Sequence, residues 1–107
     1  MIREHALLPV RPGQEAAFEA AFVEARPLIA QQPGFLGLTL SRGVESSSTY
    51  LLLVEWESVE AHEEGFRRSA QFPRWRELLH HFYEPKPVVE HYVEVPAGSA
   101  DGTLPQH

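Results

Sequence analysis

The feature that most constrains the fold is a run of four consecutive apolar residues, Leu51 to Val54, inside a segment with strand character, residues 49–57. Side chains alternate between the two faces of a strand, so a run of this kind needs apolar cover on both faces of its sheet. A single layer of helices covers only one face. The chain must therefore find a second cover, and another copy of the same sheet is the simplest supplier.

The rest of the chain supplies three more strands and two helical regions. Apolar residues at spacings of three and four predict a helix over residues 14–30, in which Pro27 should kink the last turn or end it early. Ser58 is a suitable N-cap for a second helix that reaches about Ser69, and Phe72-Pro73 begins another helical piece. Strands are predicted over residues 2–10, 35–42, 49–57 and 88–95.

This order predicts an α+β fold, the ferredoxin-like split βαβ arrangement with an antiparallel four-stranded sheet and helices on one face. With its bare face covered by a second copy, the chain is predicted to be a homodimer. The 107 residues suffice for one domain, which we place at residues 1–95, and the Gly- and Pro-rich residues 96–107 are predicted to be a disordered tail.

Composition excludes several classes of function. A net charge of -6 argues against binding to nucleic acid or to anionic membranes, and no apolar run approaches the roughly 20 residues of a membrane span. The chain has no cysteine, which excludes disulfides and thiolate-ligated metals. The first ten residues lack the pattern of a secretory leader, so a cytoplasmic location is expected.

Histidine is the richest source of chemistry, with six in the chain. His62 shares a helix face with Phe66, and two interpretations stay open: an acid, base or ligand in an apolar pocket, or a partly exposed residue beside Glu63. Neighbouring helical histidines such as His80 and His81 point about 100° apart, so no metal site is expected. His5 and His91 lie on strands and are interpreted as structural.

Aromatic residues crowd into the second half of the chain, and a small sheet-and-helix sandwich with many rings favours a flat apolar pocket for a planar aromatic ligand. Besides His62, Trp75 is the best local hydrogen-bond donor, so these two are the catalytic candidates. We expect the pocket to be lined by Ala6, Phe22, Trp56, His62, Phe66, Phe72 and Trp75.

Residues 1 to about 95 resemble the antibiotic biosynthesis monooxygenase (ABM) family of dimeric α+β barrels. The resemblance rests on the Pro12-Gly13 turn, on the segments QPGFLG from Gln32 and LVEWES from Leu53, and on SAQF from Ser69 and VVEHY from Val88. It implies that two ferredoxin-like sheets pack face to face.

Family members often carry a pocket His or Trp where this chain has Phe66, and the haem-degrading members use positions that align with Ala6 and Arg76. The resemblance thus implies a cofactor-free monooxygenase that acts on a planar phenol or quinol, with no bound haem. The alternative is a non-catalytic small-ligand-binding or structural dimer of the same fold.

Overall fold

A computed structural model of the chain describes residues 1–96. Its elements follow the predicted order. They are β1 (Ile2–Pro9), α1 (Glu15–Ala30), β2 (Phe35–Arg42), β3 (Thr49–Trp56), the π-helix η1 (Ala61–Phe66), α2 (Phe72–Leu79), the 3-10 helix η2 (His80–Phe82) and β4 (Val89–Tyr92). All but residue 96 of the predicted disordered tail lies outside the described residues, and the domain boundary after residue 95 stays a prediction.

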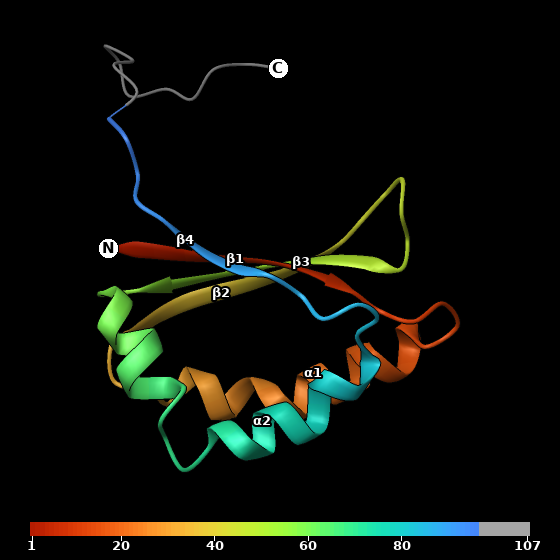
Figure 1. Cartoon of the computed structure of the whole chain (residues 1–107), viewed down its shortest axis with the longest axis horizontal. Coiled ribbons are helices and arrows are strands. Elements are labelled where there is room, and N and C mark those ends of the chain that lie inside the picture. The colour runs from red at the N-terminus through yellow and green to blue at the C-terminus, as the bar shows by residue number, and fades with distance from the viewer. Residues whose placement is uncertain (97–107) are drawn as a thin grey trace.

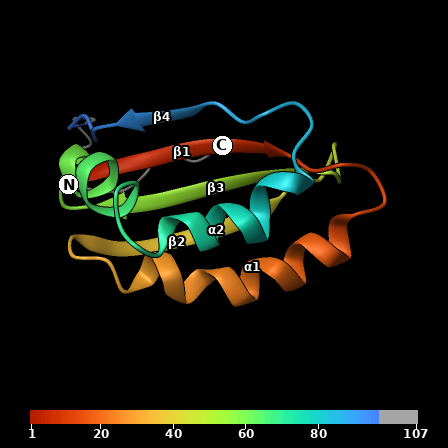
Figure 2. The same cartoon turned by 60° about the horizontal axis from the view of Figure 1, so that its bottom comes forward.

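The four strands form one antiparallel sheet in the order β2-β3-β1-β4, which confirms the ferredoxin-like α+β fold. Figure 1 shows both helices on the same side of the sheet, and Figure 2 shows the strands side by side above them. No helix within residues 1–96 is long and apolar enough to cross a membrane.

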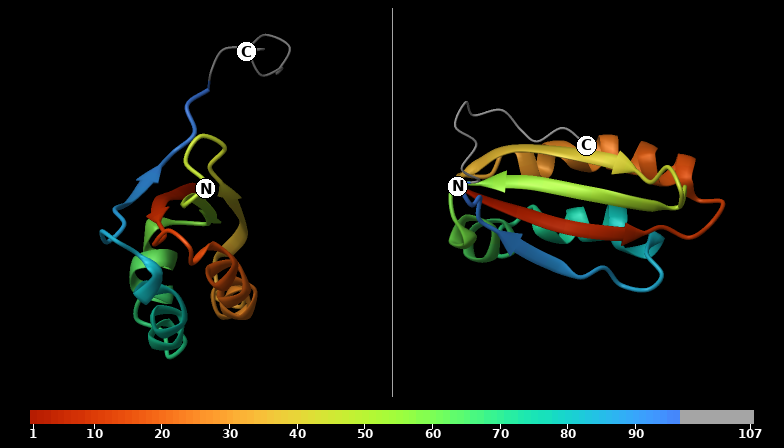
Figure 3. Two further views of the ribbon diagram at one scale, coloured as in Figure 1. Left: turned by 90° about the vertical axis from the view of Figure 1, so that its right-hand side faces the viewer. Right: turned by 90° about the horizontal axis from the view of Figure 1, so that it is seen from above.

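The helix-facing side of the sheet carries the core. Leu52 and Val54 of β3 are 4% and 0% exposed, whereas Leu51 and Leu53 point to the opposite side and are only half-buried in a single chain. Within residues 1–96 no helix lies over that opposite side, as the view from above in Figure 3 shows. The chain itself therefore covers one face of the apolar run.

Helix α1 reaches Ala30, as predicted, and Pro27 does not end it early. Two other local expectations are corrected by the structure. Strand β4 stops at Tyr92 and not at residue 95, because β1 begins at Ile2 and offers few partners beyond the Arg3–Tyr92 pair. The other corrected expectation is the helix predicted from Ser58 to about Ser69.

Ser58 does cap that segment, since the backbone N–H of Ala61 donates to its Oγ at 3.1 Å. Its main element, however, is the π-helix Ala61–Phe66, which ends before Ser69. The backbone N–H of Arg67 donates to the carbonyl of His62 at 3.0 Å, a bond across five residues. Such turns are rare and concentrate at functional sites, and this one carries His62 and Phe66.

Candidate functional site

A cavity of about 160 Å³ lies between the sheet and the second helical region. Its floor is the inward face of β1, where Glu4, Ala6 and Leu8 follow each other at every second position. Side chains of η1, α2 and the segment before β4 complete the walls. The cavity is thus built from elements far apart in the sequence.

The structure brings most of the expected pocket residues together at this cavity. Its lining includes Ala6, His62, Phe66, Phe72 and Trp75. The other two expected residues, Phe22 and Trp56, lie behind the lining and not in it. Phe22 packs its ring at 5.8 Å from the ring of Trp75, and Trp56, which is fully buried, stacks on His62 at 5.4 Å.

Phe66 forms a rigid part of the wall. It is 1% exposed, and its ring lies 5.2 Å from Phe72 and 5.4 Å from Trp75, edge to face in both pairs. Trp75 is 6% exposed and lies beside it. Phe66 offers no proton-transfer group, so any acid–base chemistry in this cavity falls to other side chains.

Glu4 is the acidic residue of the lining, and sequence reasoning missed it. Its side chain is 7% exposed, and its Oε1 accepts a hydrogen bond of 2.9 Å from the indole N–H of Trp56. Burial raises the pKa of Glu4 from 4.5 to about 7, and the Trp56 bond opposes that rise. Near neutral pH this carboxyl is therefore able both to hold and to release a proton.

His62 lies next to Glu4 and is 4% exposed, so the interpretation as a partly exposed helix residue is wrong. Its Nε2 is 3.4 Å from Glu4 Oε1, and its Nδ1 is 2.8 Å from Nε2 of His91 on β4. Burial, and then His91, lower the pKa of His62 from 6.5 to about 4. The imidazole is consequently neutral at pH 7, and its contact with Glu4 is not an ion pair.

The chain resembles known proteins in both sequence and fold. The family model for antibiotic biosynthesis monooxygenase matches residues 1–78. The chain belongs to the antibiotic biosynthesis monooxygenase family. It is 47% identical over 95 residues to the uncharacterized protein YczJ of Bacillus subtilis strain 168, covering 89% of this chain and 100% of YczJ.

Solved structures of ABM proteins share the fold. One from Bordetella bronchiseptica with the same family description is 41% identical, covers 88% of this chain and 96% of its own, and superposes with a TM-score of 0.84. SnoaB, a cofactor-independent oxygenase from Streptomyces nogalater, is 22% identical, with a TM-score of 0.76 over 98% of this chain and 97% of SnoaB. At that identity SnoaB supports the fold alone.

One group of side chains in this ABM chain has the composition of a metal site. Among residues 1–96, ligand atoms of His62, Glu63 and His91 lie within 4.8 Å of one another. The sequence argument against a metal considered only neighbouring histidines and overlooked this pair from two elements. In the structure, however, the two imidazoles bond each other, and Glu63 pairs with Arg67 at 3.1 Å. The absence of a bound metal stays a prediction.

The alternation of side chains along β1 could have identified Glu4 as a buried residue, because it places Glu4 on the same face as Ala6 and Leu8. Sequence reasoning treated residues 3–5 as a polar interruption and did not follow the alternation. No comparable signal existed for His91, because its contact with His62 joins residues 29 apart on different elements.

Proposed function

We propose that this ABM protein is a cofactor-independent monooxygenase for a small planar phenol or quinol, with Glu4 as the base that accepts the substrate's phenolic proton. The observation that carries the proposal is a buried carboxyl, held by the Trp56 N–H, in the lining of an apolar, aromatic-walled cavity. The proposal is consistent with the shared fold of SnoaB, which is a cofactor-independent oxygenase.

The chemistry requires little from the protein beyond a base, orientation and exclusion of water. When Glu4 takes the phenolic proton, the substrate anion gives one electron to O2, and the two radicals combine at a ring carbon. Loss of water from the resulting peroxide leaves a new carbonyl. For a quinol the balance is quinol plus O2 to hydroxyquinone plus water, with one oxygen atom in each product.

His62 is the positioning residue for this base. Its Nε2 faces Glu4 and its Nδ1 faces His91, so the imidazole pair connects the buried carboxyl to a half-buried position on β4. When Glu4 is protonated, His62 is free to accept from it and to donate to His91; when Glu4 is ionised, both imidazoles take the opposite tautomer. The proton taken from the substrate thereby gains a route out of the cavity.

Cavity size favours a one-ring substrate. Drug-sized ligands occupy pockets of roughly 300–1,000 Å³, and a cavity of about 150 Å³ accepts benzene. The cavity here measures about 160 Å³. Hydroquinones and catechols should accordingly be better substrates than dihydroxynaphthalenes or anthrones.

Oxygen uptake tests the proposal. We expect the purified protein, with less than stoichiometric metal by elemental analysis and without added cofactor, to consume one O2 per hydroquinone. With ¹⁸O2, one labelled atom should enter each product molecule. Binding of one-ring quinols without uptake above the protein-free rate, across the whole panel, would instead favour the non-catalytic ligand-binding alternative.

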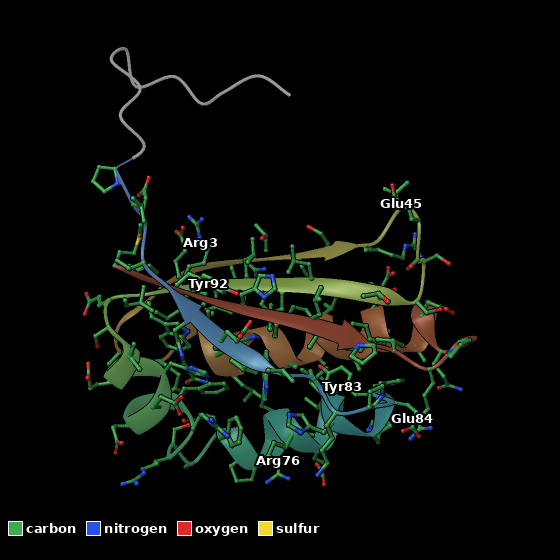
Figure 4. All side chains as sticks on the ribbon, turned by 45° about the horizontal axis from the view of Figure 1, so that its top comes forward. Arg3, Glu45, Arg76, Tyr83, Glu84 and Tyr92 are labelled. Atoms are coloured by element: carbon green, nitrogen blue, oxygen red, sulfur yellow. The ribbon has the colours of Figure 1, made fainter. Side chains whose placement is uncertain are left out.

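We further propose that the helix-free face of the sheet is covered by a second copy. Leu7 on β1, which is 52% exposed, pairs in register with Leu51 on β3, and Leu53 lies on the same face. Figure 4 places Arg3 and Tyr92 at the same side of the sheet. Burying such a face in both copies would remove more than roughly 1,000 Å², the size of a specific interface.

Sedimentation tests the dimer. We expect a species of about twice the 12.1 kDa chain mass at micromolar concentration. Leu7→Glu should give a folded monomer, because this side chain is half exposed within one chain and a buried, unpaired carboxylate at the interface is costly. Val44→Glu, at a side chain that is 90% exposed, is the control and should stay dimeric. A stable wild-type monomer would contradict the proposal.

A further inference from the structure

Beyond Glu4 and His62, the cavity has a second polar region that the proposed reaction does not use. The cavity lining contains three basic residues, Arg67, His80 and Lys86, and one acidic residue, Glu4. The chain as a whole carries a net charge of -6. Basic residues therefore outnumber acidic ones in the lining, in contrast to the chain as a whole.

Of the two cationic side chains in the lining, Arg67 pairs with Glu63 at 3.1 Å, whereas Lys86 has no acidic partner among residues 1–96. Arg76, an exposed residue of α2 outside the lining, also forms no ion pair within residues 1–96. Burial lowers the pKa of His80, and Arg76, Lys86 and Arg67 lower it further. The imidazole of His80 is therefore neutral near pH 7 and is available as a hydrogen-bond donor.

Lys86 lies away from the base along the cavity. From Glu4 to Leu8, the floor of β1 extends roughly 13 Å at the usual strand rise. Beyond Leu8, Val10 bridges to Tyr83, which lines the cavity just before Lys86. Glu4 therefore marks one end of the floor, and the segment that carries Lys86 approaches the other.

The backbone around Lys86 is also restricted. Pro85 and Pro87 flank it, and proline fixes its own φ and limits the residue before it. Pro87 itself lines the cavity. The ammonium group is thus carried on a stiff segment of the cavity lining, which reduces the entropy lost when it binds an anion.

From these observations we propose that the ligand carries a carboxylate on its aromatic ring, opposite the phenolic oxygen, and that Lys86, with His80 beside it, binds this carboxylate. Among the one-ring phenols of the proposed function, hydroxybenzoate-type acids would then be the preferred ligands. This rests on the proposed function for the role of the phenol, but the carboxylate contact itself requires no turnover.

Equilibrium binding tests the proposal, with Trp75 in the cavity wall as the fluorescent reporter and calorimetry as the second readout. The probes are 4-hydroxybenzoate and its neutral analogue 4-hydroxybenzyl alcohol. We expect the wild type to bind the carboxylate at least tenfold more tightly, the worth of one charge-assisted contact, and the preference to fall with rising salt.

Lys86→Met keeps the aliphatic stem and removes the charge. It should weaken 4-hydroxybenzoate binding about tenfold and leave the neutral analogue within twofold, while Lys86→Arg should retain the preference. Arg26→Met removes an exposed cation of α1 outside the cavity and is the matched control. Equal affinity for both probes, absence of carboxylate binding, or an equal loss for both in Lys86→Met would overturn the proposal.

The two proposals fail in different ways. A carboxylate preference without oxygen uptake leaves the anion site standing and rejects the oxygenase. Uptake with a neutral hydroquinone and no carboxylate preference retains the oxygenase and rejects the anion site.

Discussion

Replacing Glu4 by Gln should lower the turnover of a one-ring quinol by roughly 10²–10⁴-fold, the usual worth of a positioned general base. Gln has the same shape, and its amide oxygen is able to accept the Trp56 N–H bond that holds Oε1 in the wild type at 2.9 Å. It has no site for the substrate's proton at neutral pH. The loss should therefore appear in kcat, with ligand affinity changed only a few-fold.

Two further variants sharpen this test. Glu64→Gln makes the same chemical change at an exposed carboxyl of η1 and should retain wild-type turnover. His62→Ala keeps Glu4 but removes the group beside it, so it should reduce turnover less than Glu4→Gln. Full activity in Glu4→Gln, with activity lost in His62→Ala, would transfer the role of base to His62 and contradict the proposal.

The second large effect concerns the pH dependence of stability. Burial raises the pKa of Glu4 from 4.5 to about 7, so its contribution to stability is present at low pH and is lost as the pH rises through 7. Burial lowers the pKa of His62 from 6.5 to about 4, so its contribution is present above pH 6.5 and is lost as the pH falls through 4. The two groups therefore act in opposite directions over overlapping ranges.

In the wild type these contributions cancel between about pH 4.5 and 6.5. The native pair holds one proton there, on Glu4, and the unfolded chain also holds one, on His62, so this pair adds no slope to the stability curve. Removing either group exposes the slope of the other. The change amounts to about 3 kcal/mol over the full range of each shift.

Urea unfolding at a series of pH values measures this. Relative to the wild type, Glu4→Gln should gain stability as the pH rises from 4.5 to 7, and His62→Gln should gain stability as it falls from 6.5 to 4. The exposed Glu64→Gln should run parallel to the wild type. Parallel curves for all four proteins would mean that Glu4 and His62 are not the neutral pair described here.

Much of the fold followed from local patterns. The order of strands and helices, the Ser58 cap and the bounds of β2 depend on turn residues and on the period of apolar residues, which act over a few positions. The run from Leu51 to Val54 also predicted apolar cover on both sides of β3, and a single chain supplies it on one side only. The many aromatic residues in the second half of the chain also predicted an apolar pocket.

The acid–base group was decided by the tertiary structure. Glu4 and Trp56 are 52 residues apart, and His62 and His91 are 29 apart. Antiparallel pairing of β1 with β3 and β4 brings the four side chains together, with Glu4 and His62 in the cavity lining. Alternation tells which face of its own strand a side chain occupies, but not which distant element packs over that face. Desolvation depends on that packing, so a carboxyl that looked like part of a polar interruption became the buried acid of the site.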